Sequence, residues 1–184
     1  MRLVWNSAVN PWQCGRIAVI AAPVDQPPGT IDAEVQEQDR ALLLQVSDNL
    51  PAEPEAPAWY LANILNRQPS LKPGTARLVE RKIPAVIQAI IYDVEQETVC
   101  RPEWIIAALH SILTIAREQN FTSLGIPLLG YHHSGLATME LLKFLDDALR
   151  VTPQSNLNSV WLMTPDNFDY ALMAKVFSTC NKSE

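Results

Sequence analysis

The alternation of apolar and polar residues divides the second half of the chain into strands and helices. Ala85–Tyr92 (AVIQAIIY) is the clearest apolar run of strand length, and Pro102–Gln119 repeats its apolar residues with helical spacing. Strand and helix then continue to alternate, which favours a largely parallel sheet flanked by helices. The later elements predicted from the same pattern are a strand over Ser123–Leu129, a helix over Thr138–Arg150, a strand over Ser159–Met163 and a helix over Asp166–Phe177.

The first half of the chain has shorter regular patterns. Arg16–Ala22 and Ala41–Val46 are apolar runs of strand length, and Ile31–Gln36 alternates apolar with polar residues, as a half-exposed strand does. Asp48–Pro57 (DNLPAEPEAP) contains three prolines and predicts a long, stiff loop. A further strand is predicted over Ala76–Val79, after a turn containing proline and glycine.

The composition is that of a single globular domain spanning 1–184. Apolar residues make up 48% of the 184 residues, and no stretch reaches the roughly 18 apolar residues that a membrane-spanning helix needs. The N-terminus lacks the long apolar core of a secretory signal, so we expect a cytoplasmic protein that does not bind membranes. The three cysteines, Cys14, Cys100 and Cys180, have no metal-type spacing, and we expect free thiols.

The negative charge is concentrated in one segment. Between Ile17 and Asn66 there are eight acidic residues and one base, Arg40, within a chain of net charge −6. Such a segment repels nucleic acid, whose phosphates are normally met by clustered Lys and Arg. We therefore expect no nucleic-acid partner, and we interpret the segment as a solvated acidic face.

Candidate chemistry gathers in the stretch SLGIPLLGYHHSGL, Ser123–Leu136. Its apolar first half gives way to Gly130, two adjacent histidines and Gly135, and a helix follows. A loop at the carboxyl end of a parallel strand that leads into a helix N-terminus is a common place for an anionic ligand.

These residues resemble the macro domain, a family that binds ADP-ribose and related nucleotides. In that family a strand ending in proline and two apolar residues enters a Gly-Thr-Gly-x-x-Gly loop; here Pro127–Leu129 match the strand end, and Gly130 and Gly135 the first and last glycines. Lys72–Tyr92 looks like the family's turn and strands upstream, and Leu44–Asn49 is similar in position to its Ile-Val-Asn-Ala-Ala-Asn stretch. The resemblance implies a three-layer α/β/α fold with a mixed, largely parallel central sheet. It covers roughly 30–178, with 1–29 as an N-terminal extension or additional strands.

The departures from the family pattern fall on the ligand loops. Tyr131 replaces the loop threonine, His132 replaces the central glycine, and Val46 stands at the first asparagine, so that only Asn49 matches the second. A side chain at His132 crowds a position where backbone would approach a diphosphate. Degenerate loops of this kind predict a remodelled site. The ligand-binding candidates are Asn49, Gly130, Tyr131, His132, His133, Ser134 and Gly135.

Other reactive residues give no catalytic or metal motif. His132 and His133 are adjacent and lack metal-ligand spacing, and Ser134 is not in a Gly-x-Ser-x-Gly context. Asp146 and Asp147 point about 100° apart on a helix, which predicts a solvated face rather than a carboxylate pair. We therefore expect no catalytic residue, no metal and no cofactor.

Three functions remain open from the sequence. The first is a non-catalytic module that binds a nucleotide, an ADP-ribose-like molecule or another anion, or that binds a protein. The second is an ADP-ribose-processing hydrolase. The third is a structural partner domain like the N-terminal domain of leucine aminopeptidases, with a protein partner or a second copy of the chain on its surface. The losses in the ligand loops favour binding over catalysis.

Overall fold

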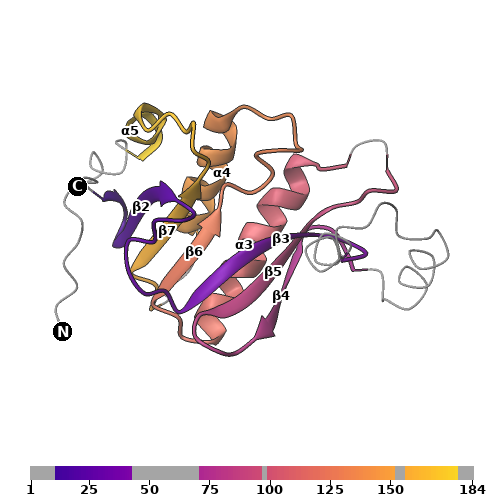
Figure 1. Cartoon of the computed structure of the whole chain (residues 1–184), viewed down its shortest axis with the longest axis horizontal. Helices are drawn as coiled ribbons and strands as arrows, with labels where there is room; N and C mark the ends of the chain where they lie inside the picture. The colour runs from indigo at the N-terminus through magenta and orange to yellow at the C-terminus, as the bar shows by residue number, and fades with distance from the viewer. Residues whose placement is uncertain (1–10, 43–70, 97–98, 152–155, 178–184) are drawn as a thin grey trace.

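A computed structural model describes residues 11–42, 71–96, 99–151 and 156–177 (Figure 1). Within these residues a seven-stranded sheet has the order β1-β2-β7-β6-β3-β5-β4. Its strands are β1 (Trp12–Cys14), β2 (Ile17–Pro23), β3 (Ala33–Asp39), β4 (Thr75–Glu80), β5 (Ala85–Tyr92), β6 (Ser123–Pro127) and β7 (Ser159–Thr164). The described helices are α3 (Pro102–Glu118), α4 (Thr138–Val151) and α5 (Ala171–Phe177).

The sheet is mixed and largely parallel, as predicted. The pairs β2–β7, β7–β6, β6–β3 and β3–β5 are parallel, and only the outer pairs β1–β2 and β4–β5 are antiparallel. Strands inside a parallel sheet are covered on both faces, and β5 and β7 are accordingly continuous apolar runs that are buried almost throughout. Residues 12–23, which precede the region of family resemblance, form β1 and β2 within this same sheet.

The described helices pack against one face of the sheet. In Figure 1, α3 and α4 lie behind β3, β5 and β6, and α5 lies beside α4 near β1 and β2. Each helix buries the apolar stripe that its sequence predicted, because residues three and four apart share a helix face. The buried stripe of α3 is Ile105, Ala108, Leu109, Ile112, Leu113 and Ala116, and that of α4 includes Leu141, Leu142, Leu145, Ala148 and Leu149.

The last helix is shorter than its sequence pattern predicted. It begins at Ala171 rather than Asp166, because a turn precedes it in which the Phe168 N–H donates to the Pro165 carbonyl. The Asp169 carboxylate then accepts the Ala171 N–H at 3.0 Å, which caps the helix start.

The prediction that Asp146 and Asp147 form a solvated face is wrong for Asp146. Its side chain is buried in the contact between α4 and β1, where it accepts a hydrogen bond from the Cys14 thiol at 3.3 Å and pairs with Arg150 at 2.9 Å. Asp147 is exposed. The 100° step between adjacent helical residues therefore sends one carboxylate inward and the other to solvent.

The feature that positions the candidate site is the junction between β3 and β6. These strands pair over only two residues, Ala33 with Leu124 and Glu34 with Gly125. Just before this pairing, the Asp32 carboxylate accepts the backbone N–H groups of Thr122 and Ser123 and the Thr122 hydroxyl. The amino ends of the two strands are thus clamped together, and beyond residue 34 they have no further paired positions.

β3 itself differs in extent from its prediction. The alternation over Ile31–Gln36 was correctly interpreted as a half-exposed strand, but the strand continues to Asp39, which is fully buried. Of the predicted strand Ala41–Val46, the first two residues lie in the turn after β3, and 43–46 lie outside the described residues. The matched stretch Leu44–Asn49, the loop Asp48–Pro57 and Val46 also lie outside them.

Candidate functional site

A pocket of about 430 Å³ opens where the carboxyl ends of β3, β6 and β7 meet. This edge of a parallel sheet is where α/β folds bind their ligands, and the volume lies within the range of small-molecule sites. The pocket occupies the region in which β3 and β6 are no longer paired. Its lining residues are Val24, Glu34, Val35, Gln36, Glu37, Gln38, Pro127, Leu128, Tyr131, His132, Met163, Thr164 and Pro165.

The loop after β6 folds into consecutive tight turns at one wall of this pocket. Gly130 has φ +80°, and a Cβ on it would lie 2.6 Å from Ile105 Cδ1, so both its backbone angle and its packing on α3 require glycine. Its carbonyl accepts the N–H groups of His133 and Ser134. The loop is therefore packed onto α3 and hydrogen-bonded to itself.

Most backbone donors of this loop already have partners within the chain. The Tyr131 N–H donates to the Leu128 carbonyl, and the Leu136 N–H to the Ser134 hydroxyl at 3.2 Å. At the start of α4, the Ala137 N–H donates to the Glu140 carboxylate at 3.1 Å, as in a capping box. An anion-binding loop offers free N–H groups to its ligand, and few remain here.

The first donor of the loop, the Gly130 N–H, is bound by a carboxylate of the chain itself. Glu37 Oε1 accepts it at 2.8 Å, and Glu37 Oε2 accepts the hydroxyl of Tyr92. Burial raises the pKa of Glu37, although these two hydrogen bonds and the nearby histidines His132 and His133 act in the opposite direction.

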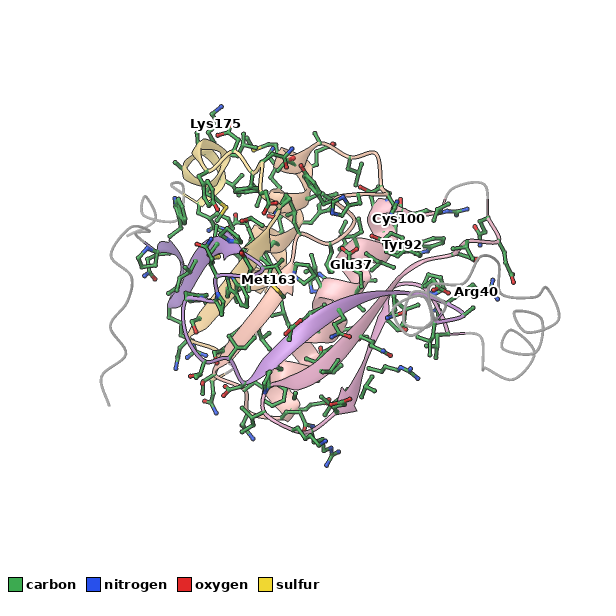
Figure 2. The ribbon with its side chains drawn as sticks, viewed as in Figure 1. Glu37, Arg40, Tyr92, Cys100, Met163 and Lys175 are labelled. Carbon is green, nitrogen blue, oxygen red and sulfur yellow. The ribbon has the colours of Figure 1, made fainter. Side chains whose placement is uncertain are left out.

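The groups behind Glu37 are buried and stay protonated. Figure 2 shows Glu37, Tyr92 and Cys100 close together at this end of the sheet. Burial, and then the charge of Glu37, raise the pKa of the Tyr92 hydroxyl well above its usual range. The same two causes raise the pKa of the Cys100 thiol to about 12, and this cysteine is free and buried.

The aromatic side chains of the loop divide between the pocket and a contact with Tyr92. Tyr131 and His132 line the pocket, with their rings edge to face at 5.0 Å between centroids. His133 faces the other way and packs edge to face on Tyr92 at 5.4 Å. The two adjacent histidines therefore take different positions, with His132 lining the pocket and His133 packed on Tyr92.

Gln38 is the unexpected member of the pocket lining. Its side chain is only 4% exposed, and its Oε1 has no hydrogen-bond partner among the described residues. A buried polar atom without a partner costs free energy, commonly about 1–3 kcal/mol. The atom is itself closed to solvent, so it is a buried polar atom beside the pocket for which the described residues give no partner.

The structure brings only part of the predicted site together. Tyr131 and His132 reach the pocket, Gly130 binds Glu37, His133 and Ser134 hold the loop's conformation, and Gly135, at φ +69°, ends the turns. Asn49 lies outside the described residues.

The sequence analysis missed the contribution of β3. Glu34, Glu37 and Gln38 line the pocket, whereas the acidic residues of this segment were interpreted as a solvated face. That interpretation is wrong for Glu37 and for Asp39, which are half-buried and buried. The available signal was the run of polar residues from Gln36 to Asp39, which directly follows the alternating part of the predicted strand.

Metal and membrane sites are not indicated by the described residues. Among them, no cluster of three or more His, Cys, Asp or Glu is arranged to hold a metal ion. None of the helices in the described ranges is both long and apolar enough to cross a membrane.

Comparison with solved structures identifies the fold. A macrodomain of Oceanobacillus iheyensis, in a structure with ADP, matches with a TM-score of 0.67 at 13% identity, over 96% of this chain and 98% of that one. The macro domain of ganglioside induced differentiation associated protein 2 matches with a TM-score of 0.60 at 16% identity, over 96% and 97%. The macrodomain of DarG from Mycobacterium tuberculosis matches with a TM-score of 0.57 at 17% identity, over 79% and 97%.

The likeness lies in structure rather than in sequence. No protein-family model matches the chain, and no curated protein matches it. The matches to the Oceanobacillus iheyensis and ganglioside induced differentiation associated protein 2 macrodomains nonetheless span nearly the whole of both chains, and the mixed sheet with its helices agrees with them. The chain therefore has the three-layer α/β fold of a macrodomain, as the resemblance of its sequence implied.

Proposed function

We propose that this chain is a non-catalytic binding module for a small nucleoside- or nucleotide-type ligand of the ADP-ribose class. The observation that carries the proposal is the pocket at the carboxyl ends of β3, β6 and β7, in which Tyr131, His132 and Gln38 converge from two segments far apart in the sequence. An apolar pocket with a few placed polar groups is the usual form of a small-molecule site.

The fold supports the class of ligand. Structures of the Oceanobacillus iheyensis macrodomain include one with ADP and a mutant with ADPR. In this chain, the ring of Tyr131 offers a stacking surface for a base, and the polar tip of His132 offers hydrogen bonds. The site residues proposed from the sequence thus keep a role, with side chains replacing backbone donors as the principal contacts.

One observation favours hydrolysis as a second candidate. Glu37 is a pocket-lining carboxylate whose pKa burial raises, and such a group can act as a general base. Against this, each of its two oxygens already accepts a hydrogen bond from the chain, which points the carboxylate toward structure rather than toward a bound water. We therefore place binding first.

Isothermal titration with ADP-ribose, AMP and adenosine tests the proposal. We expect at least one of these molecules to bind, and Tyr131→Ala and His132→Ala to weaken that binding about tenfold or more, because both side chains line the pocket. His110→Ala is the matched control, since this histidine is exposed on α3 and does not line the pocket. Absence of binding by all three molecules would contradict the proposed function.

Release of ADP-ribose from a modified protein tests the second candidate. We expect no turnover above the uncatalysed background from the native chain. Turnover that is lost in Glu37→Gln would establish hydrolysis with Glu37 as base, and the non-catalytic assignment would then be wrong.

A further inference from the structure

Three groups that can take up a proton lie together at one wall of the pocket. The Glu37 carboxylate and the His132 imidazole both line the pocket. Between centroids, the ring of His133 lies 6.2 Å from that of His132 and 5.4 Å from that of Tyr92. Tyr92 in turn donates its hydroxyl to Glu37 Oε2, so contacts run from the carboxylate to both imidazoles. Glu37, His132 and His133 thus form a titratable cluster.

The groups packed against Glu37 from the side of β5 keep their protons. They are the hydroxyl of Tyr92 and the thiol of Cys100, which forms a bridge with Tyr92. Burial and the charge of Glu37 raise the pKa of the thiol to about 12 and that of the hydroxyl well above its usual range. From β3 itself, Glu34 is the second carboxylate among the described residues that line the pocket.

The cluster can change its charge near neutral pH. Both imidazoles are exposed, and imidazole is the side chain that ordinarily gains its proton between about pH 5 and 8. Burial raises the pKa of Glu37, although its hydrogen bonds and the two histidines act in the opposite direction. Each proton that enters the cluster makes this wall more positive by one charge, whichever of the three groups takes it.

Protonation of Glu37 is compatible with its hold on the loop. Oε1 accepts the Gly130 N–H at 2.8 Å, and Oε2 contacts the Tyr92 hydroxyl. A hydroxyl accepts as well as donates, so a proton on Oε2 can be donated to the Tyr92 oxygen while Oε1 keeps the Gly130 N–H. The charge of the pocket wall can therefore change with pH while its hydrogen bonds stay in place.

An anionic group in the pocket would interact with both kinds of titratable side chain. Ionised Glu37 repels it, and a protonated His132 attracts it, because both residues line the same cavity. The loop also keeps two backbone donors for such a group, since the N–H groups of His132 and Gly135 have no hydrogen-bond partner among the described residues. A lower pH removes the repulsion and adds the attraction, so the two effects have the same sign.

We propose that an anionic ligand binds this pocket together with protons, so that its affinity increases as the titratable cluster becomes protonated. The inference rests on the proposed function, since it describes how binding at that same pocket is regulated. His132 acts on the ligand directly, whereas Glu37 acts through its charge. His133 belongs to the cluster without lining the pocket.

The test compares an anionic with a neutral ligand at two pH values. ADP-ribose and adenosine are titrated calorimetrically at about pH 5.5 and about pH 8, at constant ionic strength. The diphosphate of ADP-ribose keeps its charge over this range, whereas the phosphate of AMP titrates near pH 6 and would obscure the result. Repeating the titration at about pH 6.5 in buffers of different ionisation heat gives the number of protons bound with the ligand.

The variants each remove one titrating group and keep a side chain that forms hydrogen bonds. They are His132→Gln and Glu37→Gln, in which glutamine resembles the protonated acid and retains an oxygen for the Gly130 N–H. His110→Gln is the matched control, because His110 is exposed on α3 and does not line the pocket. Circular dichroism and thermal unfolding at both pH values show whether each variant is folded.

We expect the native chain and His110→Gln to bind ADP-ribose about tenfold or more tightly at the lower pH, with uptake of protons. Adenosine should bind within about threefold at the two pH values. His132→Gln should reduce the ratio for ADP-ribose to within about threefold. Glu37→Gln should also reduce it, by strengthening the binding of ADP-ribose at the higher pH about threefold or more.

Several outcomes would overturn the inference while the proposed function stands. ADP-ribose binding that is unchanged or weaker at the lower pH is one, and an equal gain for adenosine is another. A native ratio that persists in folded His132→Gln or Glu37→Gln, or binding of adenosine alone, has the same consequence. If neither molecule binds at either pH, the inference and the proposed function both fail.

Discussion

The Glu37 carboxylate and the Gly130 backbone N–H are hydrogen-bonded at 2.8 Å across the opening between β3 and the loop that follows β6. Glu37 lies on β3 and Gly130 in the loop after β6, and these two strands pair only at their amino ends, so this hydrogen bond joins the two segments at the pocket. Because Tyr92 binds the second oxygen, the contact also ties the loop to β5. The loop's shape thus depends on a residue 93 positions earlier in the chain.

Gly130→Ala should destabilise the fold more than Gly135→Ala. Both glycines have positive φ, at +80° and +69°, which costs a non-glycine residue about 1–2 kcal/mol. At Gly130 the new Cβ would also lie 2.6 Å from Ile105 Cδ1, whereas nothing lies within 4 Å at Gly135. We expect the free energy of unfolding to fall by about 3 kcal/mol or more for Gly130→Ala and by about half that for Gly135→Ala, measured by urea unfolding. Equal losses would mean that the Ile105 side chain moves away from the new Cβ without reducing the free energy of unfolding.

Glu37→Gln should change how stability depends on pH. Because burial raises the folded-state pKa of Glu37 above 4.5, the folded chain holds this proton more tightly than the unfolded chain does. Its contribution is therefore fully present below pH 4.5 and is lost as the pH rises through the folded pKa. As the pH rises from 4.5 to neutrality, the melting temperature of the native chain should decrease relative to that of Glu37→Gln. A difference that is constant with pH would contradict the raised pKa.

Cys100 should be unreactive while the chain is folded. Its pKa of about 12 leaves almost no thiolate at neutral pH, and its side chain is buried. Alkylation by iodoacetamide at about pH 8, read at the Cys100 peptide by mass spectrometry, should be at least about a hundredfold slower in the native chain than in denaturant. Comparable alkylation rates in the two conditions would show that the structure around Cys100 opens readily in the native chain.

Asp146→Ala should be destabilising, and Asp147→Ala should be nearly neutral. Removing the Asp146 carboxylate leaves the Cys14 thiol without this acceptor and Arg150 without this ion pair, which we expect to cost about 1–3 kcal/mol of unfolding free energy. Asp147 is exposed on the next position of the same helix, where substitutions usually change stability by less than about 0.5 kcal/mol. Urea unfolding of the two variants gives the comparison. Similar values would place both carboxylates on the solvated face.

Sequence patterns predicted most of the fold because its strands and helices are strongly periodic. The strand Ala85–Tyr92 has the predicted bounds, and α3 and α4 differ from theirs by a single residue at the end. These elements bury continuous apolar runs or stripes, so hydrophobicity alone marks them. Where polar residues are buried, as in β3 beyond Gln36, the same criterion ends the strand too early.

The candidate site was predicted from one segment and is built from two. The loop after β6 was found from its glycines and histidines, which are local signals. Glu37 and Gln38 give no local signal, since their roles follow from the placement of β3 beside β6, a contact between residues about ninety positions apart. Sequence spacing shows which face a side chain takes, but not which loop that face will meet.

The strand order has a consequence for how the chain is assembled. β3, β4 and β5 come from one continuous stretch, 33–92, and pair with one another, whereas β2 has its parallel partner in β7, with Ala18 opposite Ser159. During synthesis, the strands of the stretch 33–92 can pair as soon as this stretch leaves the ribosome. β2 cannot pair with β7 until nearly the whole chain has been synthesised. Bringing β2 and β7 together closes a long loop, and the entropy cost of that closure is offset only when the complete sheet has formed. The boundary between the early and the late part is the junction of β3 with β6, so the pocket is completed last, when the C-terminal strand arrives.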